Sequence, residues 1–207
     1  MLAPKHSAWR IKLLNWYSSY AIKRHFTEVK LTGEIVNLNR AFLVIGNHTS
    51  WWDGFWMLYL NDKKLHKRFH VMMLEKELEK RKYFNHCGAY SINPGHISVR
   101  KSLHTTLELL SNSENLVVFY PEGKINASTS VPKKFQPGIG ALLKQAPAQA
   151  QILFTVCLTD YFSQQKPTLY IYFKEVSFRE VETLEKLEER YNSFHSACVQ
   201  AQNQWSS

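Results

Sequence analysis

One stretch of the sequence decides the fold: residues 41–56, which have the sequence AFLVIGNHTSWWDGFW. Its first six residues form a continuous apolar run, as in a strand that is buried on both faces of a parallel sheet. Polar residues then open a helix that we expect over residues 54–61, with Thr49 or Ser50 as its N-cap. A strand that passes directly into a helix is the repeating unit of layered α/β proteins.

The rest of the chain continues this alternation. Further strands are expected at residues 29–36, 69–74, 89–92, 116–120, 152–158 and 169–176, and further helices at 8–25, 75–83, 98–112, 137–146 and 180–203. The pattern predicts an α/β fold with a mixed, partly parallel central sheet flanked by helices. We expect two parts: an amphipathic membrane-interface helix over residues 1–27 and an α/β domain over residues 28–207.

The first expected helix carries a stripe of mostly aromatic residues. The stripe recurs at helical spacing and consists of Trp9, Leu13, Trp16, Tyr17 and Tyr20, with Arg10, Lys12, Lys23 and Arg24 beside it. Such a helix suits a membrane interface, where rings lie at headgroup depth and cations meet anionic lipid. The alternative is a helix docked on the protein's own core, and one helix can do both with different edges.

The positive charge of the chain is concentrated in two places. The 207 residues include 26 Lys and Arg against 17 Asp and Glu, a formal net charge of +9. Residues 1–30 carry a net charge of +5 and residues 61–82 carry +4, so the remaining chain is neutral. No nucleic-acid-binding module is recognisable, and this distribution favours a lipid surface or a phosphorylated ligand over nucleic acid.

Several absences in the sequence bear on compartment and cofactors. Cys87, Cys157 and Cys198 are far apart and form no C-x-x-C pair, which favours a reducing compartment and argues against a metal ribbon. We find neither a signal peptide nor a run that approaches 18 consecutive apolar residues. His66 and His70 lack acidic or cysteine partners nearby, so no metal site is expected. We predict a peripheral protein on the cytoplasmic face of a membrane.

His48 and Asp53 are the strongest candidates for chemistry. On a continuous helix, residues five apart would diverge by about 140°, so the two side chains meet only if His48 precedes the helix and folds back. Asp53 would then accept one imidazole N–H and leave the other nitrogen as a general base. This is the His–Asp half of a triad without an enzyme nucleophile. The alternative is a core histidine and a carboxylate at a helix N-terminus.

A second polar turn lies in VVFYPEGK, residues 117–124, directly after another apolar strand. Ligands of α/β sheets bind at the carboxyl ends of the strands. We therefore expect this turn and the His48 turn to meet at one edge of the sheet.

The two turns together resemble the glycerolipid acyltransferase family, of which lysophosphatidate acyltransferase is the best-known member. Residues 47–53 resemble its first block, N-H-x4-D, and residues 119–123 resemble its third block, F-P-E-G, with one residue inserted or substituted. Residues 88–93 and 152–156 fall where the second and fourth blocks are expected. The blocks occur in the family's order, and their combination is far more specific than a lone His-x4-Asp.

The resemblance implies transfer of a fatty acyl group from a thioester of coenzyme A or acyl carrier protein to a hydroxyl of a lysophospholipid-type acceptor. His48 would deprotonate the hydroxyl, which attacks the thioester directly, and Asp53 would orient His48. Glu122 and Gly123 would position the acceptor and surround the oxyanion. The thioester is a co-substrate, so neither a bound cofactor nor a metal is implied. The expected substrate-binding residues are Asn47, Glu122, Gly123, Lys124 and Arg100.

The sequence departs from the family where arginines usually bind the acceptor phosphate. Asn93 and Pro94 occupy that place in the second block, and Lys124 and Ile125 occupy it in the third. Lys124 and Arg100 are possible substitutes, although lysine lacks the bidentate geometry of arginine. Three alternatives therefore stay open: a non-phosphorylated lipid hydroxyl as acceptor, hydrolysis of a thioester or ester, and a non-catalytic basic membrane-binding protein.

Overall fold

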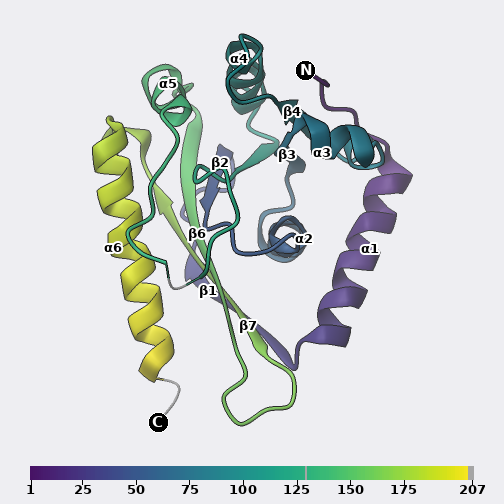
Figure 1. The fold of residues 1–207 in the computed structure, drawn as a ribbon, viewed down its shortest axis with the longest axis vertical. Helices are drawn as coiled ribbons and strands as arrows, with labels where there is room; N and C mark the ends of the chain where they lie inside the picture. Colours follow the sequence, from purple (N-terminus) through teal and green to yellow (C-terminus); the bar gives the residue numbers. More distant parts are fainter. Residues whose placement is uncertain (129, 205–207) are drawn as a thin grey trace.

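The computed structural model describes residues 1–128 and 130–204, which form a seven-stranded sheet with helices on both faces (Figure 1). The strand order is β1-β7-β6-β2-β5-β3-β4. β6 and β7 pair antiparallel, and the other neighbouring strands pair parallel. This confirms the predicted mixed, partly parallel sheet. The strands are β1 (Glu28–Glu34), β2 (Ala41–Gly46), β3 (Arg68–Leu74), β4 (Ala89–Ile92), β5 (Asn115–Phe119), β6 (Ala150–Asp160) and β7 (Thr168–Val176).

The longer helices lie where the sequence predicts them, with small shifts at their ends. They are α1 (Ala8–His25), α2 (Asp53–Leu60), α3 (Glu75–Lys80), α4 (Val99–Leu110), α5 (Gly138–Gln145) and α6 (Leu184–Asn203). α6 begins later than predicted because Ser177 and Glu180 form a capping box around a separate 3-10 turn. A short π-helical segment, Asn61–Leu65, extends α2.

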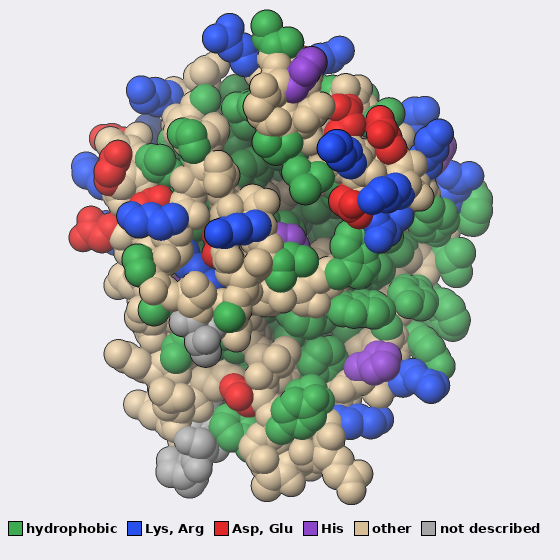
Figure 2. All heavy atoms as spheres, viewed as in Figure 1, with side chains coloured by type: hydrophobic (Ala, Val, Ile, Leu, Met, Phe, Trp, Pro, Cys, Tyr) green, Lys and Arg blue, Asp and Glu red, His purple; other side chains and the backbone are tan. Residues whose placement is uncertain are grey.

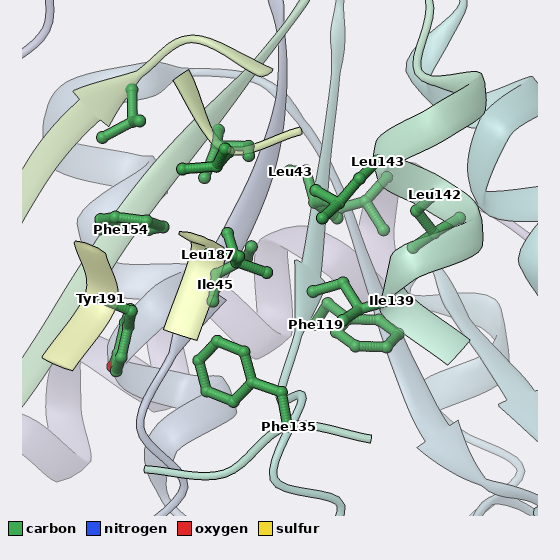
Figure 3. Packing of buried hydrophobic residues seen from close by; sticks show 14 of the residues in the cluster. Leu43, Ile45, Phe119, Phe135, Ile139, Leu142, Leu143, Phe154, Leu187 and Tyr191 are labelled. Atoms are coloured by element: carbon green, nitrogen blue, oxygen red, sulfur yellow. The ribbon is translucent and has the colours of Figure 1, made fainter. Parts of the chain in front are cut away.

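β2 lies at the centre of the sheet, and all six of its residues are buried. Because side chains alternate along a strand, Leu43 and Ile45 face one layer of helices, and Phe42 and Val44 face the other. The first pair packs with residues of α5 and α6, including Ile139 (Figure 3). The second pair packs with residues of α1 and α2. Burial on both sides fixes β2, and with it the turn that follows.

α1 docks on the protein mainly with residues outside its aromatic stripe. Its buried residues include Ser18 and Ile22, and the Ser18 hydroxyl donates a hydrogen bond to the carbonyl of Phe55 in α2. Most of the stripe points outward, with Trp9 61% and Trp16 62% exposed, whereas Tyr17 also contacts the ring of Phe55. Figure 2 shows hydrophobic side chains gathered on the side of the molecule where α1 lies. Among the described residues, no helix has the length and apolar character needed to cross a membrane.

Candidate active site

The two polar turns meet at the carboxyl edge of the sheet. β2 and β5 are parallel neighbours, so the turns that follow Gly46 and Phe119 lie at the same edge. Gly46 permits a close approach there, since a Cβ atom would lie 2.8 Å from Thr155 Oγ1 and 3.4 Å from the ring of Tyr120. The predicted meeting of the two motifs is therefore confirmed, and it depends on a glycine at the last position of β2.

His48 folds back onto the first residue of α2, as the spacing argument requires. Its Nδ1 lies 2.8 Å from Oδ2 of Asp53, whose side chain is 1% exposed. The same oxygen accepts the backbone N–H groups of Thr49 at 2.7 Å and Ser50 at 2.9 Å, and Oδ1 accepts the Thr49 hydroxyl at 3.2 Å. The predicted N-cap is wrong: α2 begins at Asp53, and its carboxylate binds the preceding turn.

A carboxylate can only accept hydrogen bonds, so Nδ1 of His48 carries a proton and Nε2 is the basic nitrogen. The ring borders a cavity of about 700 Å³ whose walls are mostly apolar. Phe55 and Leu58 of α2, Val71 of β3 and Leu103 of α4 are among its lining residues. The arrangement places a general base beside a space that suits a hydrocarbon chain.

Tyr120, which sequence reasoning did not select, stacks on the imidazole of His48. The ring centroids are 4.5 Å apart and the planes differ by 16°. Burial, reinforced by the Asp53 carboxylate, raises the pKa of the Tyr120 phenol well above its ordinary value, so the hydroxyl stays protonated. No described residue gives this buried hydroxyl a hydrogen bond. The signal in the sequence is that Tyr120 departs from the F-P-E-G pattern.

Glu122 does not face the cavity, where the predicted contact with the acceptor would be made. Its carboxylate is buried and does not line the cavity. Oε1 accepts the backbone N–H of His48 at 3.3 Å, and Oε2 accepts Nδ2 of Asn126 at 2.7 Å. The ammonium of Lys133 lies 3.7 Å from Oε2. Burial lowers the pKa of this ammonium, while the Glu122 carboxylate partly opposes that shift. Sequence reasoning missed Asn126 and Lys133, because neither belongs to a recognised motif.

The remaining predicted substrate-binding residues divide into two groups. Gly123 and Lys124 line the cavity, and Gly123 adopts a φ of +69° that favours glycine. Asn47 is committed to the fold instead, because its side-chain amide donates to the carbonyl of Cys157 and accepts its N–H, both at 2.9 Å. Arg100 is exposed at the start of α4 and is not among the lining residues.

Comparisons with known proteins establish the family and the fold of the chain. A search of curated proteins finds no match. Among solved structures, the chain is similar to the 1-acyl-sn-glycerophosphate (LPA) acyltransferase PlsC from Thermotoga maritima, with a TM-score of 0.66 and 14% identity. The match covers 92% of this chain and 79% of that one, and at this identity it shows the fold alone. The sequence model of the family described as Acyltransferase matches residues 28–159, which is more than half of the chain. The chain therefore belongs to the acyltransferase family.

Proposed function

We propose that the protein transfers a fatty acyl group from an acyl thioester, either acyl-CoA or acyl carrier protein, to a hydroxyl of a lysophospholipid-type acceptor. One observation carries the proposal: the buried Asp53 holds Nδ1 of His48 at 2.8 Å while the same imidazole borders an apolar cavity of about 700 Å³. The pair supplies a base, and the cavity suits an acyl chain.

In this mechanism, Nε2 of His48 removes the proton from the acceptor hydroxyl as its oxygen attacks the thioester carbonyl. A C–O bond forms, and the carbonyl oxygen becomes an oxyanion. The negative charge of Asp53 stabilises the imidazolium, because Oδ2 of Asp53 accepts the hydrogen bond from Nδ1. Collapse of the intermediate breaks the C–S bond, and the proton on Nε2 passes to the leaving thiolate. The products are an ester and a free thiol, with no covalent enzyme intermediate.

The polar residues of the cavity bear on two candidates for the acceptor headgroup. Lys124 supports an anionic group such as a phosphate, the headgroup named for PlsC. Arg100 is outside the cavity wall. This observation favours the second candidate, a non-phosphorylated lipid hydroxyl. Mass spectrometry of the products formed from an equimolar mixture of phosphorylated and neutral acceptors separates the two.

We further propose that the aromatic stripe of α1 rests on the cytoplasmic surface of a membrane. The stripe is exposed, and Lys12, Lys23 and Arg24 beside it are exposed as well. Flotation with anionic vesicles tests this with the double variant Trp9→Ser/Trp16→Ser, which should bind less than the parent protein. Val36→Ser is the control, because Val36 is 86% exposed and lies outside α1, between β1 and β2. Equal binding of both variants would contradict the proposal.

The catalytic proposal is tested with His48→Ala and the control His104→Ala. The side chain of His104 is 72% exposed on α4 and pairs with Glu108, so its loss should leave turnover unchanged. We expect His48→Ala to remain folded and to lose transfer by about 10²- to 10⁴-fold, the usual share of general-base catalysis. Ester and free fatty acid are measured with and without acceptor. Release of fatty acid that does not depend on the acceptor would identify a hydrolase instead.

A further inference from the structure

Lys133, in the segment between β5 and α5, is a charged residue inside the protein. Its side chain is 0% exposed, and its ammonium lies 3.7 Å from Glu122 Oε2 and donates to the carbonyl of Ala127 at 3.3 Å. A lysine is almost never fully buried unless it is paired. The residue is not in the cavity wall, so direct contact with a substrate does not account for its position.

The partner of Lys133 is attached to the main chain of His48. Glu122 Oε1 accepts the His48 N–H at 3.3 Å, and the backbone N–H of Asn126 donates to the His48 carbonyl at 2.8 Å. The Asn126 side chain closes the arrangement by donating to Glu122 Oε2 at 2.7 Å. Both backbone groups of His48 are thus held by the segment that follows β5. We call Glu122, Asn126 and Lys133 the backbone clamp.

α6 fixes Lys133 in turn. The Lys133 N–H donates to Oδ1 of Asn192 at 2.6 Å, and Nδ2 of Asn192 donates to the Lys133 carbonyl at 3.0 Å. A side-chain amide that pairs with both backbone groups of one residue leaves that residue little freedom. The main chain of Lys133 is therefore fixed by the C-terminal helix, and its ammonium is placed by Glu122 and the carbonyl of Ala127.

We propose that Lys133 is a positioning residue for catalysis: it supplies the counter-charge of the buried Glu122 carboxylate and so holds the main chain of His48 in its productive place. Removing one partner of a buried ion pair leaves the other charge without compensation. Glu122 would then turn toward water and release the His48 N–H. A displacement of about 1 Å at a reacting group can cost about 100-fold in rate.

The first test compares Lys133→Met with its neighbour Lys134→Met. Lys134 is exposed and pairs with Glu188 at 2.9 Å, which makes it a control of the same chemistry at an adjacent position. For Lys133→Met we expect kcat to fall about 100-fold while KM changes less than about threefold, because the clamp touches His48 and not the cavity. Lys134→Met should keep both constants. A folded Lys133→Met protein with unchanged kcat would overturn the proposal.

If Lys133→Met does not fold, two double variants keep the test decisive. Both replace the two charged partners together, so neither leaves an unpaired charge in the interior. Glu122→Gln/Lys133→Met keeps an acceptor for the His48 N–H, and Glu122→Leu/Lys133→Met does not. We expect the first to retain kcat to within about tenfold of the parent protein and the second to lose about 100-fold. Equal kcat values in the two proteins would show that the contact to His48 does not matter, and the proposal would fail.

This proposal rests on the proposed function, because the clamp acts through His48 as the base. The test therefore includes one measurement that does not depend on turnover. The backbone amide resonance of His48 in ¹⁵N-labelled protein reports the hydrogen bond to Glu122 directly. It should move in Glu122→Leu/Lys133→Met and stay in place in Lys134→Met. An unmoved resonance overturns the clamp, whereas absence of acyl transfer in the parent protein, with a resonance that moves as expected, overturns only the proposed function.

Discussion

Asp53→Asn separates the electrostatic role of Asp53 from its packing, because the two side chains have nearly the same shape. Oδ2 of Asp53 accepts three hydrogen bonds, from His48 Nδ1 and from the backbone N–H groups of Thr49 and Ser50. An asparagine that keeps its oxygen at this place can retain the three contacts. What it loses is the negative charge beside the imidazole.

The magnitude follows from those contacts. Hydrogen bonds to charged acceptors contribute about 1 kcal/mol more than neutral ones, so the three bonds lose about 3 kcal/mol together. Burying a neutral amide costs less than burying a carboxylate, which reduces the net loss of unfolding free energy to about 2 kcal/mol. The imidazolium of the transition state also loses its counter-charge. We expect kcat to fall about 10³-fold, which corresponds to about 4 kcal/mol of transition-state stabilisation.

The assay measures release of the free thiol from the acyl donor, and urea unfolding is measured on the same preparations. Asp62→Asn is the control, because Asp62 follows α2 by two residues and makes an exposed pair with Lys63 at 2.9 Å. Both its kcat and its stability should be close to those of the parent protein. If Asp53→Asn loses stability but keeps more than about a tenth of kcat, Asp53 serves only the turn, and its role toward His48 is refuted.

Two further predictions concern buried groups, one beside His48 and one in β3. Tyr120→Phe should keep kcat within about twofold and should not lower the unfolding free energy, since it removes a buried hydroxyl that no described residue bonds; a large fall in kcat would show that the hydroxyl contacts a substrate. Burial lowers the pKa of His70 from 6.5 to about 3, and that of its neighbour His6 to about 4. Below pH 6.5 these two histidines therefore bind protons in the unfolded chain but stay neutral in the folded chain. Stability should decrease from pH 6.5 toward pH 4, with His70 accounting for about 2 kcal/mol at pH 5; urea unfolding of His70→Gln should show a flatter dependence on pH, and an equally steep one would contradict the assignment.

The sequence was sufficient for the parts of the fold that depend on local pattern. The apolar run before Gly46 and the turn residues after it predicted β2 and the approach of His48 to Asp53, because both depend on residues close in the chain. The parallel pairing of β2 with β5 brought the second motif to the same edge, which a general rule for α/β sheets anticipates. Local pattern and sheet topology thus located the base and its carboxylate.

The orientation of the second motif was beyond the sequence, because it depends on contacts between distant residues. A glutamate in a Pro-Glu-Gly turn can face a cavity or the interior with equal local geometry. Here a lysine eleven positions further along the chain draws Glu122 inward, and that lysine is held by Asn192 of α6. No periodicity or motif marks such a partner. Arg100 shows the converse, since a cation near a motif in the sequence is exposed and does not line the cavity in the fold.

His48 is consequently held by three kinds of contact, which come from two elements of the fold. Asp53 of α2 fixes one ring nitrogen, the ring of Tyr120 limits its tilt, and the segment after β5 holds its main chain. The contact from Asp53 comes from the start of α2 and the other two come from the segment after β5, so the geometry of the base is a property of the assembled sheet edge and not of the N-H-x4-D block alone. This explains why a lone His-x4-Asp carries little information: without the second strand end, the histidine has an oriented ring but no fixed backbone. The specificity of the two motifs together therefore reflects a physical requirement, since a base must be held in both its ring and its main chain before proton transfer can be directed at one substrate oxygen.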